Sequence, residues 1–118
     1  MERKELGYLG EQKIADFLEK DGFKILSRNY KVKKGEVDII ATKDNLISFI
    51  EVKTRVNPKL SMHELVNYTK QKKIVLATMT FLRHNTCYLE YICRFDVALY
   101  DITSDEITYI PNAFYGQI

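Results

Sequence analysis

The chain has 118 residues, of which 46% are hydrophobic and 29% charged, a balance typical of a soluble globular protein that excludes wholesale disorder. No apolar run reaches the roughly 18 residues that a membrane span needs. None follows the N-terminal residues Met1–Glu5 either, so we expect no membrane partner and no signal peptide. Cys87 and Cys93 are too few for a disulfide framework, which favours reduced thiols and a cytoplasmic location. Because no repeat or linker is visible, we expect a single domain over residues 1–118.

The charges are unevenly distributed along the chain. Residues 1–84 carry 17 basic and 11 acidic side chains, a net charge of +6, whereas residues 85–118 carry 1 basic and 5 acidic side chains, a net charge of −4. Basic residues cluster without an intervening acid between Lys24 and Lys34 and again between Lys70 and Arg83. Such clusters attract polyanions, but a solvated surface accounts for them equally well.

The first half of the chain predicts one helix and three strands. Apolar residues at helical spacing indicate a helix over Glu2–Lys20, which Asp21-Gly22 ends. A strand is expected over Phe23–Tyr30, followed by a turn at Lys33-Lys34-Gly35. Two further strands rich in Val, Ile and Phe are expected over Glu36–Thr42 and Leu46–Thr54.

The second half predicts one helix and two strands. The helix is expected to begin near Ser61, because Ser61 and Glu64 have the spacing of a capping box, and to run toward Arg83. Whether Asn67-Tyr68-Thr69 interrupts this helix is left open. Strands are expected over Tyr91–Tyr100 and Ile107–Ile110. The predicted order is α-β-β-β-α-β-β, an α/β fold with a small mixed central sheet flanked by helices.

The register of the central hairpin brings charged residues together. If Asp44-Asn45 forms a two-residue loop, Lys43 pairs with Leu46, Asp38 lies opposite Glu51, and Glu36 lies opposite Lys53. This register gives one apolar face and one face on which the charges stand beside further apolar side chains. The apolar face holds Val37, Ile39, Ala41, Ile50 and Val52, and the other holds Glu36, Asp38, Glu51 and Lys53 beside Ile40, Ile47 and Phe49.

Two carboxylates opposed at about 5 Å repel each other unless a positive charge lies between them. Lys53 is one candidate for that charge, and a divalent cation held by carboxylate oxygens and water is the other. A carboxylate pair on Mg²⁺ with a neighbouring lysine suits phosphodiester hydrolysis, since the metal activates a water molecule and the lysine offsets charge on the phosphate. A charged sheet face without a metal explains the spacing about as well.

The pattern of Asp38 followed by Glu51-Val52-Lys53 on adjacent strands resembles the core motif of the restriction-endonuclease-like superfamily, the PD-(D/E)xK nucleases. A longer series of matches in the same order resembles the YraN-like family of predicted endonucleases, which is similar to archaeal Holliday junction resolvases. These matches are Gly10-Glu11, Ala15, Gly22, Arg28-Asn29, Gly35–Ile40, Phe49–Lys53, Arg55, Lys70, Arg94–Val97 and Asn112–Phe114.

The resemblance implies a restriction-endonuclease-like fold and cleavage of DNA with Mg²⁺ or Mn²⁺, in repair or recombination. By carry-over, Asp38 and Glu51 would be metal ligands, Lys53 the catalytic lysine, and Glu11 a further acidic member of the catalytic and metal site. Because no sequence-reading motif is present, the substrate would be recognised by its structure. Branched and single-stranded DNA are candidates, and the sequence does not decide between them. The resemblance also suggests a homodimer, as in the junction resolvases.

Several assignments have plain structural alternatives. Without the resemblance, the better reading of Glu11 is an exposed helix residue paired with Lys4 or Lys13. Glu36 has an alternative as a cross-strand partner of Lys53. Asp96 is expected to be structural, close to Arg94. Six basic residues are candidates for nucleic-acid binding, with a solvated surface as the alternative: Arg28, Lys33, Lys34, Arg55, Lys70 and Lys73.

No nucleotide cofactor is expected, because no Gly-rich phosphate loop is present. Two rival functions remain beside the nuclease. One is a module that binds nucleic acid on the same fold without cutting it, and the other is a scaffold protein with an incidental acidic pair.

Overall fold

The computed structural model describes residues 2–56 and 66–116 of the chain. Their elements follow in the order α1 (Arg3–Lys20), β1 (Lys24–Val32), β2 (Gly35–Lys43), β3 (Leu46–Arg55), α3 (Tyr68–His84), a short 3₁₀ helix η1 (Thr86–Tyr88), β4 (Ile92–Asp101) and β5 (Glu106–Phe114). The mixed α/β class and the order α-β-β-β-α-β-β are confirmed. In these two ranges, no helix is both long and apolar enough to cross a membrane.

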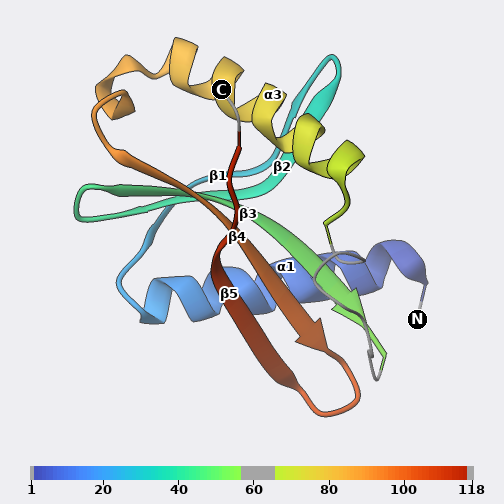
Figure 1. The fold of residues 1–118 in the computed structure, drawn as a ribbon. Helices are drawn as coiled ribbons and strands as arrows, with labels where there is room; N and C mark the ends of the chain where they lie inside the picture. The colour runs from blue at the N-terminus through green and yellow to red at the C-terminus, as the bar shows by residue number, and fades with distance from the viewer. Residues whose placement is uncertain (1, 57–65, 117–118) are drawn as a thin grey trace.

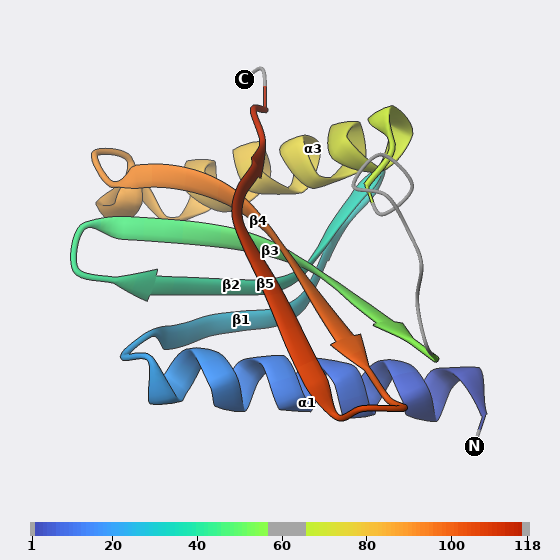
Figure 2. The same ribbon diagram turned by 60° about the horizontal axis from the view of Figure 1, so that its bottom comes forward.

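The strands form one five-stranded sheet in the order β1-β2-β3-β4-β5. All neighbours are antiparallel except β3 and β4, which run parallel over Leu46–Arg55 and Ile92–Asp101. A parallel pair needs a crossover connection, and α3 lies on that connection. Figures 1 and 2 show α1 on one face of the sheet and α3 on the other.

Each helix covers its own apolar cluster. The cluster beneath α1 contains Ile14 and Leu18 of the helix together with Ile39 and Ile50 of the sheet. The cluster beneath α3 contains the buried residues Val37, Ile40, Ile47, Phe49, Val66, Ile74, Ala77, Phe81, Phe95, Val97 and Phe114. Because both faces of β2 and β3 are covered, these strands place apolar residues on both sides.

The structure describes the predicted second helix as α3, whereas its expected start near Ser61 lies outside the described residues. Helix α3 begins at Tyr68, and the side chain of its N-cap residue Asn67 accepts a hydrogen bond of 2.9 Å from the backbone N–H of Lys70. An asparagine oxygen at this position satisfies a backbone donor that the helix itself leaves unpaired. The break considered at Asn67-Tyr68-Thr69 is therefore the start of α3. The expected capping box of Ser61 and Glu64 lies outside the described residues.

Strand β5 is longer than the four residues expected. It continues through Pro111 to Phe114, beyond the expected end at Ile110. Asn112 has a positive φ of 54°, and the pairing with β4 shifts register between Phe95 and Val97. Pro111 lacks an N–H donor and is tolerated because β5 is an edge strand.

The predicted hairpin register is correct at the turn and ends before the charged residues. Lys43 pairs with Leu46, and the paired residues continue to Ile39 and Ile50. The expected pairs Asp38–Glu51 and Glu36–Lys53 are not part of this ladder. Beyond Ile50, β3 stays paired with β4, while β2 turns away toward α3, so the two strands diverge (Figure 2).

One face assignment on β2 is wrong. Val37 was expected beside Ile39, but it packs in the cluster under α3, whereas Ile39 packs under α1. The neighbouring strand β1 changes face at the same level, because its residue Tyr30 packs under α3 while Arg28 contacts α1 through Gln12. Between these residues lies Asn29, whose positive φ of 53° turns the backbone out of the extended conformation. The alternation therefore switches at Asn29 and Asp38.

Candidate active site

The divergence of β2 and β3 opens a pocket of about 1040 Å³. The pocket lies between the N-terminal part of α1, the start of β2, the end of β3 and the first turn of α3. It brings together the four residues predicted as catalytic, Glu11, Asp38, Glu51 and Lys53. Four further charged residues also line it: Arg3, Glu36, Arg55 and Lys70. These side chains come from helices and strands that are separated along the sequence, so the cluster depends on the fold.

Asp38 links the two strands where their ladder ends. Its carboxylate Oδ2 accepts a hydrogen bond of 2.8 Å from the backbone N–H of Val52, so a side chain replaces the missing backbone pairing. This bond holds Asp38 next to Glu51, and the two carboxyl groups share a hydrogen bond. The predicted closeness of Asp38 and Glu51 is therefore present, but through a side-chain contact instead of a ladder pair.

Glu51 is a buried carboxyl group, with 4% of its surface exposed. Burial, followed by the hydrogen bond and the charge of Asp38, raises the pKa of Glu51 to about 9. At neutral pH the pair of Asp38 and Glu51 therefore holds a proton. A site that forces two carboxyl groups together in this way favours any cation that can replace the proton.

The positive charge beside Glu51 comes from α3. Lys70 Nζ lies 3.2 Å from Glu51 Oε2 and 3.1 Å from Glu36 Oε1. Burial would lower the pKa of Lys70, but the charges of Glu51 and Glu36 outweigh it and raise the pKa. The hydrogen bond from Lys70 in turn lowers the pKa of Glu36.

Two expectations about Lys53 are thereby corrected. The ammonium group that contacts Glu51 belongs to Lys70, although the charge of Lys53 also acts on Glu51. Glu36 pairs with Lys70 and not across the strands with Lys53, because β2 has left β3 at that level. Lys53 lines the pocket beside Arg55.

Glu11 is held by the strand next to β2. Its Oε1 accepts a hydrogen bond of 2.9 Å from Asn29 Nδ2 and lies 3.8 Å from Arg28 Nη2. Burial raises the pKa of Glu11, and the charge of Asp38 acts in the same direction. The alternative partners Lys4 and Lys13 are not used, since Lys13 pairs with Asp105 at 3.2 Å and Arg28 takes the ionic contact with Glu11.

Two glycines allow the helices to approach the strands at the pocket. A Cβ on Gly10 would lie 1.7 Å from Thr54 Oγ1, so only glycine lets α1 lie against the end of β3. A Cβ on Gly35 would lie 2.3 Å from the backbone oxygen of Lys73, so the start of β2 touches α3 directly. These contacts bring Glu11 and Glu36, the residues that follow the two glycines, to the pocket.

The remaining candidate nucleic-acid residues divide into two groups. Lys33, Lys34 and Lys73 line a neighbouring hollow of about 560 Å³ together with Lys31 and Glu36. Arg28 contacts α1 through Gln12 and Glu11.

The sequence analysis missed the role of Asn29. The signal for it was a polar residue that tolerates positive φ within a segment predicted to be a strand.

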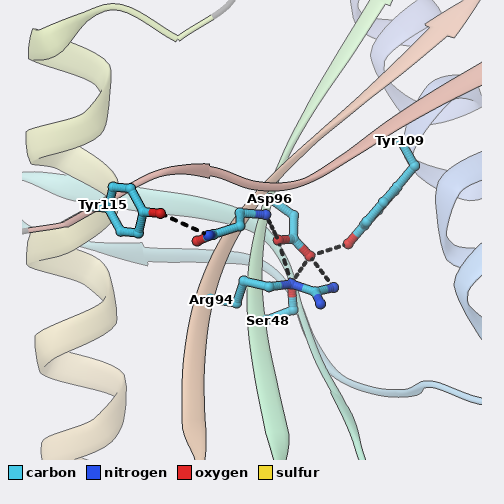
Figure 3. A network of polar contacts seen from close by, with 6 residues as sticks. Ser48, Arg94, Asp96, Tyr109 and Tyr115 are labelled. Atoms are coloured by element: carbon cyan, nitrogen blue, oxygen red, sulfur yellow. Dashed lines mark hydrogen bonds and ion pairs between the residues drawn. The ribbon is translucent and has the colours of Figure 1, made fainter.

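Asp96 is not among the residues that line the pocket, and it has a structural role at the centre of a network of polar contacts (Figure 3). It is fully buried, with two hydrogen bonds from Arg94 of 2.8 and 2.9 Å, one from Tyr109 OH and one from Ser48 Oγ. The backbone N–H of Asn112 donates a fifth, of 2.8 Å, which fixes β5 at its register shift. A buried carboxylate with this many donors remains satisfied without a metal.

The described part of the chain contains no group of three or more His, Cys, Asp or Glu residues arranged to hold a metal ion. The three-carboxylate set of Asp38, Glu51 and Glu11 is therefore not assembled here, since Glu11 is turned to Asn29 and Arg28. The pair of Asp38 and Glu51 still fits Mg²⁺ or Mn²⁺, because such ions are commonly bound by one or two carboxylates, water and substrate phosphates. The metal-ligand roles stay predictions.

The fold and the pocket define a mixed α/β protein in which two diverging strands present a carboxylate pair beside two lysines. The chain belongs to the uncharacterised protein family UPF0102, whose sequence profile matches residues 10–99, and the predicted YraN-like resemblance is confirmed.

Relatives in this family match the chain over nearly its full length. It is 41% identical over 116 residues to a UPF0102 protein of Clostridium perfringens (strain SM101 / Type A), with 94% of each chain covered. It is 42% identical over 116 residues to a UPF0102 protein of Thermodesulfovibrio yellowstonii, with 98% of this chain and 100% of the relative covered. Among solved structures, it is similar to an XisH family protein from Nostoc punctiforme, with a TM-score of 0.45, 16% identity, and 86% and 98% of the two chains covered.

Proposed function

We propose that this protein is an endonuclease that hydrolyses DNA phosphodiester bonds with Mg²⁺ or Mn²⁺. The observation that carries the proposal is the pairing of the half-buried Asp38 with the buried Glu51, in a pocket of about 1040 Å³ with Lys53 and Lys70. Two carboxyl groups held close together are energetically costly in a purely structural role, and Asp38 and Glu51 would instead be suited to holding a divalent cation at a phosphate. Selectivity for branched or single-stranded DNA, and a role in repair or recombination, are part of the proposal through the family resemblance.

Each charged residue of the pocket has its own role in this proposal. Asp38 and Glu51 would hold the cation, which supplies a bound water of lowered pKa and neutralises charge on the phosphate. Asp38 is kept in place by the backbone N–H of Val52, and Glu51 by the strand pairing of β3 with β4. Lys53 and Arg55 place positive charge in the pocket, where the phosphate acquires negative charge during the reaction. Glu11 adds negative charge next to Asp38.

The hollow beside the pocket extends the positive surface. The two cavities adjoin, because Glu36 lines both of them. A nucleic-acid strand in the pocket would therefore place its neighbouring phosphates near the lysines of the hollow, Lys31, Lys33, Lys34 and Lys73. Contacts of this kind position a nucleic acid without reading its sequence.

The experiment is a cleavage assay on duplex, single-stranded, flap and four-way junction DNA with chelator, Mg²⁺ or Mn²⁺. We expect cleavage of some of these DNAs only with a cation, and a decrease of at least about 100-fold in rate for Asp38→Ala, Glu51→Ala and Lys53→Ala. Lys20→Ala, on the last turn of α1, serves as a folded control with the same charge change as Lys53→Ala. Cleavage that persists in Asp38→Ala or in excess chelator would exclude the cation mechanism.

A second candidate is a nucleic-acid-binding module that does not cut. Lys70 already offers a positive charge to Glu51 within the chain, and this ion pair favours a pocket that is complete without a metal. Binding of the same DNAs without cleavage under any cation would support this candidate.

A further inference from the structure

Lys70 occupies a position that local helix energetics disfavour. It lies in the first turn of α3, directly after Asn67, Tyr68 and Thr69, and this turn contains no acidic residue. The start of a helix carries a partial positive charge, so a lysine there is repelled by the helix dipole. The position of Lys70 therefore needs an attraction from outside the helix.

That attraction comes from the pocket. Lys70 Nζ lies 3.1 Å from Glu36 Oε1 and 3.2 Å from Glu51 Oε2, and 24% of the lysine side chain is exposed against 4% of the glutamate side chain at residue 51. The ammonium group therefore stands at the open side of the buried Glu51. Any cation that reaches Glu51 Oε2 must share this oxygen with Lys70 or displace it.

We propose that Lys70 is an exchangeable counter-ion of the carboxylate pair: the ammonium group occupies Glu51 in the metal-free protein and leaves it when a divalent cation binds. This inference rests on the proposed function, because it concerns the same pocket. The flexible four-carbon stem of lysine allows the exchange, and Glu36, at the pocket rim with 41% of its side chain exposed, keeps a partner for the released ammonium.

The charges predict the direction of the effect. Removal of Lys70 strengthens the binding of every cation at Glu51, because one positive neighbour is removed. A divalent ion gains more than a competing proton, since the electrostatic energy scales with the charge of the incoming ion. A protein without the lysine charge should therefore bind the divalent cation more tightly, which is the opposite of what a metal-ligand or purely structural residue would show.

The test is the dissociation constant of Mn²⁺, measured by titration calorimetry at low ionic strength. Lys70→Met removes the charge and keeps most of the stem, and Lys70→Gln also keeps a hydrogen-bond donor for Glu36 and Glu51. The matched control is Lys72→Met, the same charge change on the same helix, where the ammonium lies over the Tyr68 ring at 4.5 Å from its centroid. Circular dichroism checks that each variant is folded.

We expect Mn²⁺ to bind at least about tenfold more tightly to a folded Lys70→Met or Lys70→Gln protein than to Lys72→Met. Lys70→Arg, which keeps the charge, should bind no more tightly than the wild type. Wild-type binding with an unchanged or weaker constant in both neutral variants would overturn the exchange and leave the proposed nuclease function standing. The absence of Mn²⁺ binding in the wild type and in every variant would overturn both.

Discussion

The carboxyl group of Glu51 is subject to two opposing influences. Burial and Asp38 raise its pKa to about 9, while the charge of Lys70 acts to lower it. The unfolded chain has the ordinary value of 4.5, so folding takes up a proton at neutral pH. Because the folded pKa is raised, the contribution of Glu51 to stability is full below about pH 4.5 and is lost as the pH rises toward about 9.

Glu51→Gln should therefore stabilise the metal-free protein. Glutamine keeps the shape and removes the ionisation, so the free energy of unfolding should rise by about 1–3 kcal/mol at neutral pH and change little at about pH 4.5. Denaturant unfolding in chelator at several pH values measures both. If the variant is instead less stable than the wild type at high pH, the ionised Glu51 and Lys70 form a net stabilising pair.

For single residues, the sequence predicted which two carboxylates lie close together better than it predicted which residues contact them. The spacing across the hairpin placed Asp38 near Glu51, because a two-residue loop sets the register on both strands. The contact of Lys70 with Glu51 depends on how α3 packs against the sheet, which no local pattern encodes. A lysine in a first helical turn indicates an outside partner only once the start of that helix is known.

The elements around the pocket are held by close contacts of backbone with backbone or short side chains. The start of β2, before Ile39, diverges from the end of β3, after Ile50, and α1 approaches the open side through Gly10. Sequence patterns predicted the five strands, since apolar runs bounded by turn residues are local features. They missed the divergence, because it follows from the change of face at Asn29 and Asp38, where the strict alternation assumed for a regular strand fails.

Two glycines on one helix provide a test of this arrangement. Gly10→Ala should lower the free energy of unfolding by about 1–3 kcal/mol, because its Cβ would overlap Thr54 Oγ1 and push α1 away from β3. Gly7→Ala should raise it by about 0.5–1 kcal/mol, since no atom lies within 4 Å of its Cβ and alanine favours a helix. Equal effects of the two substitutions, measured by denaturant unfolding, would show that the close approach at Gly10 does not limit the position of α1.

The whole molecule is electrically asymmetric in a way that suits a polyanion. The net charge of +2 arises from a basic first part and an acidic last part. In the fold, Lys31, Lys33, Lys34 and Lys73 gather in one hollow next to the pocket, although they come from β1, the following turn and α3. The sequence predicted the basic clusters, and the packing of the hairpin on α3 joins them.

The salt dependence of DNA binding tests this surface. The double variant Lys33→Ala/Lys34→Ala should reduce the log–log slope of affinity against salt concentration by up to about 0.9 for each duplex phosphate that these lysines neutralise in the wild type. Lys20→Ala/Lys24→Ala makes the same charge change at the end of α1 and the start of β1 and should leave the slope unchanged. Fluorescence anisotropy over a range of salt concentrations gives both slopes. Equal slopes for the two double variants would show that nucleic acid does not bind in the hollow.

The central claim is that Asp38 and Glu51 together bind a divalent cation, and the most direct measurement is the anomalous scattering of Mn²⁺ in crystals of the wild-type protein. We predict one strong peak within coordination distance, about 2.2 Å, of oxygens from both Asp38 and Glu51, with Lys70 Nζ moved away from Glu51 Oε2. Crystals of Asp38→Asn under the same conditions should lack the peak. A peak elsewhere on the molecule, or no peak between these two carboxylates at millimolar Mn²⁺, would contradict it.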